Sequence, residues 1–390
     1  MTRLSRLAVL GLAGLVLAPA APARAEDPEF NGRKMSAWLS MLQEDKLPRK
    51  RRAAVVALSQ IVAASSLTDN DVDTIYTLIG KVMRNDASEG VREQSANVLG
   101  QIKPDSGHAP KAAENMVEAL RAEKDLAVRK ELIAGVVRFG KLAKDAVRPL
   151  TLLLKDADPT TRALAADALG RFAGEAKESV ADLLPLLKDS DKAVKLAAVF
   201  AVGRVQPDDT APAAAALIEV FKTAAEMDMR REALVALGLL GDHSADTLKT
   251  LTIVLGDEKE DAEFRRHAIV ALSRFGPAVR PAEAELKAAL TKDKDKVIRL
   301  NAVRALVYGY GDQKKDLIPF LVERLKPESE SDFEVRVAVA EELGGMGPDG
   351  KPAIPALRSA QRDPQIKVRD AATAAIKAIE KPPAPPKDAP

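Results

Sequence analysis

A short pattern recurs about ten times along the chain and restricts its fold more than any other feature. The clearest copy runs from Asp158 to Gly170 and consists of a turn, an arginine, a segment of small residues and a closing glycine. Ten segments align on the basic residue that follows the turn, at Arg51, Arg92, Arg129, Arg162, Lys195, Arg230, Arg265, Arg299, Arg336 and Arg369. These opening basic residues are 33 to 41 positions apart. An internal period of that length predicts a solenoid of stacked repeats.

Apolar residues follow each opening basic residue at helical spacing. The residue three positions later is mostly small, as at Ala165, and the residue seven positions later is aliphatic, as at Leu169. Residues three, four and seven apart share one face of a helix, so the pattern predicts a helix whose small residues let its neighbours approach closely. A leucine-rich segment such as residues 150–154 comes before it and predicts another helix in the same repeat. Aromatic residues make up only 3% of the chain, so we expect a core of alanine, leucine, valine and isoleucine.

Proline and glycine mark the expected ends of these helices. Pro149, Pro319 and Pro355 stand near the start of the first helix of their repeats, where a missing backbone N–H does least damage. At or near the end of the second helix we expect a left-handed glycine cap. The glycines concerned are Gly100, Gly140, Gly170, Gly203, Gly238, Gly276 and Gly344. No alternating run long enough for a sheet separates these elements, so the sequence predicts an all-α fold.

The sequence at the start of the second helix resembles that of the HEAT-repeat family. A valine precedes the arginine at Val91-Arg92, Val128-Arg129, Val335-Arg336 and Val368-Arg369, with an aspartate in the turn and a proline in the first helix of several repeats. The resemblance covers residues 36–380. It implies a right-handed α-α superhelix of the HEAT and armadillo type with about ten helix pairs. It also implies that the second helices line a concave face that binds other proteins.

Turn aspartates and opening basic residues form the strongest polar pattern. Asp158 precedes Arg162, Asp191 precedes Lys195, Asp295 precedes Arg299 and Asp363 precedes Arg369. The resemblance implies that such residues pair in a structural ladder between adjacent repeats rather than form a binding site. The predicted ladder contains Arg92, Arg129, Arg162, Lys195, Arg230, Arg265, Arg299, Arg336 and Arg369.

The two ends of the chain differ from the repeats. Residues 1–25 have the basic start, apolar segment and small-residue cleavage signal of a secretory signal peptide. We therefore expect a bacterial protein that is exported to the periplasm or secreted. Residues 26–35 form a lead-in, and Phe30 and Trp38 are expected to cover the first layer of the solenoid. Residues 381–390 form a proline-rich tail, which we expect to be extended.

Composition argues against several other classes of protein. The chain has no cysteine, and its three histidines lie in three different repeats without metal-ligand spacing, so we predict no metal, no cofactor and no catalytic residues. Removing the signal segment takes away three arginines and no acid, which turns a net charge of +2 into −1. That balance argues against nucleic acid as a partner. No later stretch is apolar enough for a membrane span in the mature chain.

One group of residues is a candidate binding surface. Positions two, five and nine after the opening basic residue share a helix face distinct from the core face. The HEAT resemblance implies that this face lines the groove. The candidate partner-binding residues on it are Arg138, Arg171, Arg204, Arg274, Arg304, Phe200 and Tyr308. Arginine and aromatic residues are favoured in interfaces, so we hypothesise a protein partner with an acidic segment. The alternative is that each arginine simply caps helix carbonyls.

Three functions are compatible with these features. The leading prediction is a non-catalytic scaffold of the cell envelope that binds a protein on its concave surface. An alternative is an accessory factor that resembles the HEAT-like lyases of bilin attachment and holds a small molecule in the groove. A third is a nucleic-acid binder of the HEAT-like glycosylase kind, which the charge balance and the signal segment disfavour. The partner and the oligomeric state stay open.

Overall fold

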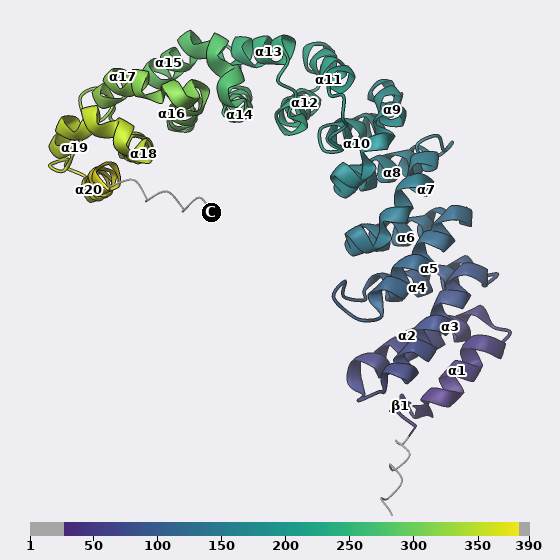
Figure 1. Cartoon of the computed structure of the whole chain (residues 1–390). Helices are drawn as coiled ribbons and strands as arrows, with labels where there is room; N and C mark the ends of the chain where they lie inside the picture. The colour runs from purple at the N-terminus through teal and green to yellow at the C-terminus, as the bar shows by residue number, and fades with distance from the viewer. Residues whose placement is uncertain (1–26, 382–390) are drawn as a thin grey trace, which may run out of the picture.

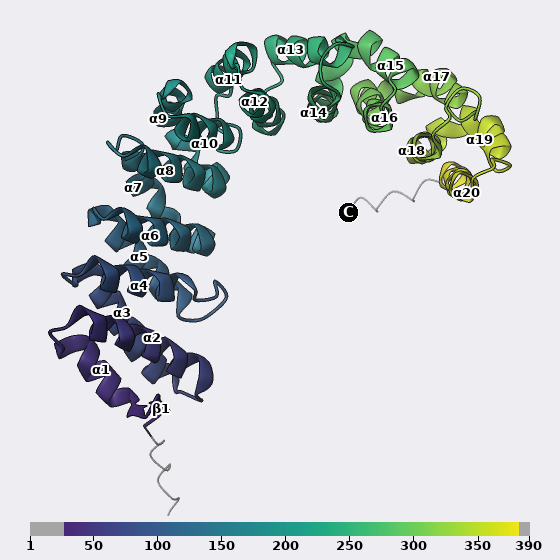
Figure 2. The same ribbon diagram turned by 180° about the vertical axis from the view of Figure 1, so that it is seen from behind.

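The computed structural model describes residues 27–381 and has the predicted all-α solenoid of ten helix pairs. The first helices of the pairs form an outer layer and the second helices an inner layer (Figures 1 and 2). The inner layer lines the concave side, as the family resemblance implied. Residues 1–26 and 382–390 lie outside the described part of the chain, so the predicted signal segment and nearly all of the predicted tail are not described.

Outer and inner elements alternate along the described chain. The outer elements are α1 (Met35–Glu44), α3 (Asp69–Asn85), α5 (Ala109–Ala122), η1 (Gly140–Ala146) with α7 (Val147–Leu153), η2 (Ala173–Ser179) with α9 (Val180–Leu183) and η3 (Leu184–Lys188), α11 (Ala211–Thr223), α13 (Ala245–Gly256), η4 (Gly276–Ala282) with α15 (Glu283–Lys292), η5 (Gly311–Leu317) with α17 (Ile318–Glu323), and η6 (Gly347–Ala353) with α19 (Ile354–Ala360). The inner helices are α2 (Pro48–Ala64), α4 (Glu89–Gly100), α6 (Leu126–Phe139), α8 (Pro159–Phe172), α10 (Lys192–Val202), α12 (Met227–Leu240), α14 (Ala262–Leu272), α16 (Lys296–Tyr310), α18 (Phe333–Gly345) and α20 (Ile366–Glu380).

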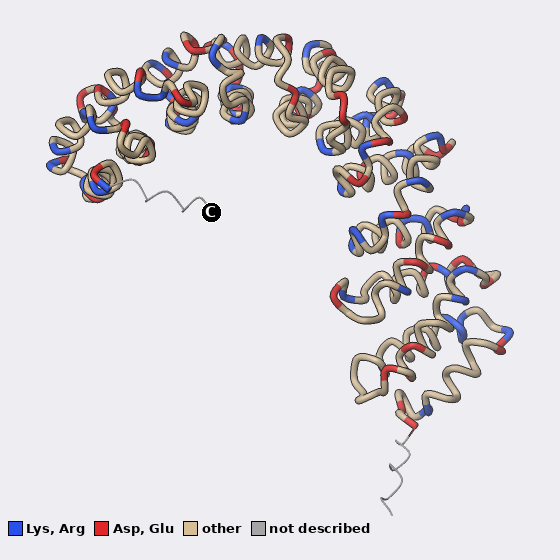
Figure 3. Tube along the Cα trace, in the orientation of Figure 1, with Lys and Arg blue, Asp and Glu red and all other residues tan. Residues whose placement is uncertain are grey.

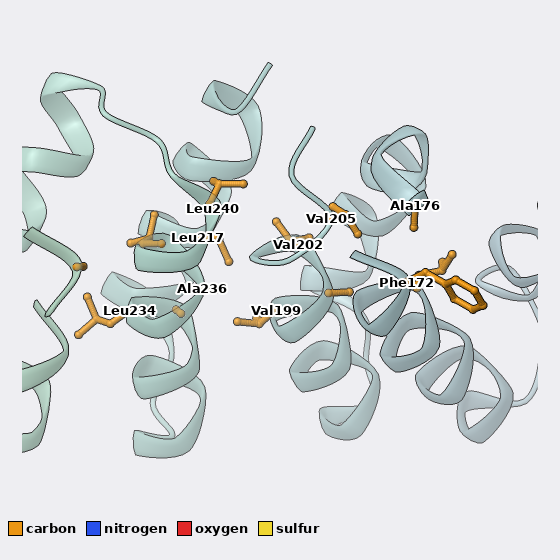
Figure 4. Packing of buried hydrophobic residues seen from close by; sticks show 14 of the residues in the cluster. Phe172, Ala176, Val199, Val202, Val205, Leu217, Leu234, Ala236 and Leu240 are labelled. Carbon is orange, nitrogen blue, oxygen red and sulfur yellow. The ribbon is translucent and has the colours of Figure 1, made fainter. Parts of the chain in front are cut away.

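The core is one continuous cluster of mostly aliphatic side chains between the two layers, and Figure 4 shows part of it. The small residues three positions after each opening basic residue are all fully buried, for example Ala165 and Ala198. The aliphatic residues seven positions after it are also buried, for example Leu169 and Val202. Ile376 is the exception: it is only partly buried, because no repeat follows α20 in the described chain. The predicted core face is therefore correct.

The prediction that glycine ends each inner helix with a left-handed cap is wrong at most positions. Of the seven glycines predicted to be caps, only Gly140 and Gly276 have positive φ, 52° and 53°. Gly100, Gly170, Gly238 and Gly344 are helical, and Gly203 follows α10 in a right-handed conformation. These five glycines lie eight positions after the opening basic residue and face a small residue of the next inner helix; the pairs are Gly100 and Gly135, Gly170 and Ala201, Gly203 and Ala236, Gly238 and Ala271, and Gly344 and Ala375. Glycine is needed at these positions because the backbones of neighbouring helices nearly touch.

Five outer elements begin with a 3₁₀ turn instead of a regular helix. Gly140, Gly276, Gly311 and Gly347 open four of these turns with positive φ, which glycine adopts without a steric penalty. Ala173 opens the fifth with a φ of 50°. The proline of the outer helix follows the turn within its first residues, at Pro149, Pro319 and Pro355, as predicted.

A short hairpin precedes the first repeat and was not predicted. Strands β1 (Glu29–Phe30) and β2 (Arg33–Lys34) pair across a turn in which Asn31 and Gly32 both have positive φ. Trp38 donates a hydrogen bond from its indole nitrogen to the Phe30 carbonyl at 3.1 Å, and the Arg33 guanidinium lies 4.7 Å from the Trp38 ring. Trp38 is only 9% exposed. Phe30 and Trp38 therefore cover the end of the core, as expected of a terminal repeat.

A buried carboxylate joins the sixth and seventh repeats. Asp242, which is 5% exposed, accepts hydrogen bonds from the hydroxyls of Thr210, Ser244 and Thr247. The Thr210 and Thr247 bonds are 2.9 and 2.6 Å long. Burial opposes ionisation of Asp242, but the hydrogen bonds outweigh it and lower its pKa.

We expect Asp242 to make folding stability depend on acid pH. Because its pKa is lower in the folded chain, it stabilises the fold above the unfolded aspartate value of about 3.9, and this contribution is lost as the pH falls through the folded value. Urea unfolding across acid pH should therefore show a shallower pH slope for Asp242→Asn than for the wild type. Equal slopes would contradict this assignment.

Candidate partner-binding surface

The predicted binding residues lie on inner helices or, for Arg204 and Arg274, two residues after the end of one, and therefore on the concave layer (Figure 1). Lysine and arginine alternate with aspartate and glutamate along this layer, so no uniformly basic stripe follows it (Figure 3). The candidate binding surface therefore consists of smaller groups with different surroundings.

Two of the predicted arginines cap a neighbouring helix. Arg138 donates to the carbonyl of Gly100, and Arg274 donates to the carbonyl of Gly238 at 3.0 Å. Each acceptor lies in the last turn of the preceding inner helix, where carbonyls lack a partner within the helix. For these two residues the structure favours the alternative interpretation, in which arginine caps helix carbonyls.

Arg171 on α8, Phe200 on α10 and Arg204, two residues after the end of α10, form a cluster. The guanidinium carbon of Arg204 lies 3.7 Å from the centre of the Phe200 ring, and that of Arg171 lies 6.0 Å from it. Arg204 also donates to the Phe200 carbonyl and to Glu232 of α12, at 2.9 and 3.1 Å. We call these three residues the Phe200 cluster. It places an aromatic ring between two cations on the concave face.

Arg171 is the more accessible cation of the Phe200 cluster. Its side chain is 55% exposed, against 27% for Arg204. Its Nε donates to Asp167 at 2.7 Å, and this hydrogen bond raises the pKa of Arg171. Sequence reasoning did not identify Asp167 and Glu232 as partners of these arginines, although both lie on the same helix face, five and two positions after an opening basic residue.

A shallow depression lies beside the Phe200 cluster. It has a volume of about 340 Å³ and is lined mainly by small and aliphatic residues of α8 and α10, among them Ala163, Leu164 and Ala197. The carboxylate residues Asp167 and Asp191 also line it. Leu164, which lines the depression, and Arg171, which belongs to the cluster, are two helical turns apart on α8, or about 10 Å along the helix axis.

Arg304 and Tyr308 form a separate exposed pair one turn apart on α16. Tyr308 is 55% exposed, and Arg304 is also exposed. Burial raises the pKa of the nearby Glu342 on α18, and the charge of Arg304 opposes this rise. The binding role of this pair, and of the Phe200 cluster, stays a prediction.

Most of the opening arginines form an ion pair with a carboxylate of the following repeat. Arg162 donates to both carboxylate oxygens of Asp189 at 2.9 and 3.0 Å, and to the carbonyl of Asp156 at 2.8 Å. Asp156 in turn accepts from Arg129. We call each such ion pair a rung. The rungs are Arg51–Asp86, Arg92–Glu123, Arg129–Asp156, Arg162–Asp189, Arg230–Glu260, Arg265–Asp293, Arg299–Glu330 and Arg336–Asp363.

The predicted ladder between adjacent repeats is present, but most of the turn aspartates named above are not its acceptors, and within residues 27–381 neither Lys195 nor Arg369 forms an ion pair. Asp158 and Asp191 instead accept backbone N–H groups and cap the starts of α8 and α10. Asp295 caps α16 and pairs with Arg266. Asp363 pairs with Arg336 of the previous repeat, and among the described residues Arg369 donates only to the carbonyls of Asp363 and Pro364.

No group of three or more potential metal ligands occurs within residues 27–381. His108 lies 2.7 Å from Asp73 and edge-on to Tyr76, and His243 packs at 4.8 Å from the Phe275 ring. Both loop histidines therefore contact side chains of the protein. None of the described helices combines the length and apolar character that crossing a bilayer requires.

The helix pairs and the repeated rungs define the chain as an α-solenoid. Its sequence matches the family model for HEAT repeats over residues 147–238 and 282–377. The chain therefore contains HEAT repeats.

Solved structures similar to this chain are likewise helical-repeat proteins. The match to a Kap121p mutant has 15% sequence identity and a TM-score of 0.52, and it covers 92% of this chain and 42% of the Kap121p chain. The match to importin beta has 13% sequence identity and a TM-score of 0.49, and it covers 88% of this chain and 51% of the importin beta chain. The chain thus spans about half the length of importin beta, and the likeness to Kap121p supports the fold alone. No curated protein matches the chain significantly.

Proposed function

We propose that this protein is a non-catalytic scaffold that binds a partner protein on its concave surface, with the Phe200 cluster at the centre of the contact. The observation that supports this proposal is an aromatic ring flanked by two guanidinium groups on adjacent inner helices. Arginine and large aromatic residues dominate the binding energy of many interfaces, because they combine apolar area with directional polar contacts.

The N–H groups of Arg171 that form no hydrogen bond among the described residues indicate which kind of group the partner presents. Only its Nε takes part in a hydrogen bond among the described residues, and its side chain is more than half exposed. The remaining N–H groups of a guanidinium suit a carboxylate, which they can bind through two hydrogen bonds. The apolar depression beside the cluster suits an aliphatic side chain. We therefore propose a partner segment that carries both an acidic and an aliphatic residue.

The location of this scaffold is also part of the proposal. The signal-like residues 1–25 support export to the periplasm or beyond, where the mature chain would begin at Glu26. The partner should accordingly be a protein of the cell envelope.

Photo-crosslinking tests this proposal. A photoreactive amino acid at Ala163 or Ala197, beside the cluster, should give one partner adduct in an envelope fraction, from a chain whose first residue is Glu26. Phe200→Ala or Arg171→Gln should each weaken partner binding by about 2 kcal/mol, the loss typical of an interface hot spot. Arg171→Gln removes only an exposed ion pair, so the fold should be unaffected.

The matched control is Leu152 on the outer helix α7, which is 67% exposed. The same photoreactive group there should give no partner adduct, and Leu152→Ala should leave binding unchanged. An adduct that persists at full yield in both cluster variants, or that forms equally from position 152, would exclude the Phe200 cluster as the contact.

A further inference from the structure

The series of rungs is interrupted between the fifth and sixth repeats. At most other junctions, a carboxylate stands six positions before an opening basic residue and forms an ion pair with the opening arginine of the preceding repeat. Six positions before Arg230 stands Ala224, and the opposing residue is Lys195 rather than an arginine. Within residues 27–381, no carboxylate lies within ion-pair distance of Lys195. This junction therefore lacks its rung.

Side chains, not the backbone, cause the gap. Ala224 has φ and ψ of −68° and 132°, and it follows α11 as the carboxylate residues follow their own outer helices. Asp86 has −66° and 136°, Glu123 has −67° and 136°, and Asp293 has −67° and 137°. A carboxylate at position 224 would therefore start from the same backbone geometry as a rung residue.

The ion pairs that do cross this junction are more exposed than the rungs. They are Lys188–Glu219, Lys192–Asp228, Arg204–Glu232 and, through the connection to the sixth repeat, Lys177–Asp208. The Arg204–Glu232 pair is the most buried of these, at 27% and 24% exposure. By comparison, the side chains of Arg162 and Asp189 at the preceding junction are 15% and 10% exposed. Exposed pairs contribute little to stability because water and salt screen them.

The backbones of two neighbouring inner helices are in close contact at the same junction, which gives a hinge a pivot point. A Cβ at Gly203 would lie 2.5 Å from the Cα of Ala236, so α10 and α12 nearly touch there. Figure 4 shows Val199 and Val202 on one side of this contact and Ala236 and Leu240 on the other. The connection to the sixth repeat contains Gln206, a non-glycine residue with a φ of 47°.

The shape of the solenoid changes at this point. The repeats up to α8 form a nearly straight column, and the stack turns through α9–α12 into an arc (Figures 1 and 2). The missing rung thus lies where the stack changes direction.

We propose that the junction of the fifth and sixth repeats is a hinge, and that the Arg204–Glu232 ion pair on the concave side restrains it. Arg204 stacks on the same Phe200 ring as Arg171, so a partner segment whose carboxylates bind both guanidinium groups of the Phe200 cluster competes with Glu232 for that of Arg204. A ligand shifts a conformational equilibrium only by binding one state more tightly, and this competition supplies that difference. The coupling to a partner rests on the proposed function; the hinge itself does not.

Distances between spin labels in the free mature chain test the hinge. The chain has no cysteine, so paired cysteines give site-specific labels without background. One pair at the exposed residues Lys130 on α6 and Lys292 on α15 spans the junction, and a control pair at Arg49 and Lys130 lies entirely before it. We expect a broader distance distribution for the spanning pair than for the control pair.

Two sets of substitutions should change the width of the distance distribution of the spanning pair in opposite directions. Lys195→Arg with Ala224→Asp restores the missing rung and should narrow the spanning distribution to the width of the control. Glu232→Gln removes the restraint on Arg204 and should broaden it. A spanning distribution that is already as narrow as the control, or that the restored rung leaves unchanged, overturns the hinge. An unchanged distribution in Glu232→Gln overturns the role of the Arg204 ion pair.

These outcomes are independent of partner capture. The labels report on the free chain, so a failed crosslinking experiment would reject the proposed function and leave the hinge measurable. A rigid junction with normal partner capture would reject the hinge alone.

Discussion

Arg336→Ala is expected to destabilise the last two repeats by about 3–5 kcal/mol, because it leaves a buried carboxylate without its counter-ion. The side chains of Arg336 and Asp363 are 3% and 1% exposed, the lowest values of any rung. Arg336 donates to both Asp363 oxygens at 2.9 Å and to the Glu330 carbonyl at 2.8 Å. In the variant, Asp363 keeps only the backbone N–H of Gln365 as a partner.

Hydrogen exchange resolves this effect better than a single unfolding midpoint, since repeats of a solenoid unfold in part independently. Amides of α18 and α20 should exchange faster in Arg336→Ala, while those of α4 and α6 should not change. The matched control is Lys188→Ala, whose ion pair with Glu219 is largely exposed and should leave exchange unaltered. Replacing both partners, as Arg336→Met with Asp363→Leu, should recover much of the loss. Equal exchange in Arg336→Ala and the wild type would contradict a structural role for the rung.

Gly344→Ala is expected to be the second most damaging change, at about 1–3 kcal/mol, which is typical of an overpacked core. The added Cβ would lie 2.7 Å from the Cα and 2.9 Å from the Cβ of Ala375. Because backbone atoms of α20 form this contact, rotation of a side chain cannot relieve it. The two helices must separate, and the gap would weaken the packing of the terminal repeat. Thermal unfolding followed by circular dichroism should show a lower midpoint.

The neighbouring glycine provides the control. A Cβ at Gly345 would meet no atom within 4 Å. Gly345→Ala should therefore be neutral or stabilise the chain by up to about 1 kcal/mol, since alanine costs less conformational entropy than glycine in a helix. If both alanine variants lowered the midpoint equally, a general loss of glycine would explain the effect, and close packing against Ala375 would not.

The repeat number, the helix pairs and the core face could be predicted because they depend on periodicity alone. The buried positions of Ala165 and Leu169 follow from their spacing to Arg162 and from the geometry of a helix. The role of Gly170 could not be predicted in the same way. A glycine that follows a helical pattern is usually a cap, and only the position of the next repeat shows that Ala201 lies against it.

The partners of the ladder were missed although the sequence contained a signal for them. Asp86, Glu123, Asp156 and Asp189 each stand six positions before an opening basic residue. The aspartates nearer to the arginine, such as Asp158, are the more obvious acceptors by spacing. Those aspartates instead satisfy free N–H groups at helix starts, a role for which an aspartate at that position is well suited.

The candidate site was predicted only in part. Phe200 and Arg204 share a helix face at a spacing of four, so their contact could be expected. The capping of Gly100 by Arg138 depends on how closely α4 and α6 approach, which no spacing within one helix reveals. The same applies to Glu232, which reaches Arg204 from the next repeat.

The position of Trp38 decides what spectroscopy of this protein will report. It is the only tryptophan of the chain, and it lies under the N-terminal hairpin at one end of the stack. Its fluorescence therefore monitors the melting of the first layer, whereas circular dichroism averages over all ten helix pairs. The difference between the two melting curves would measure how far the cooperativity of the solenoid extends from that end.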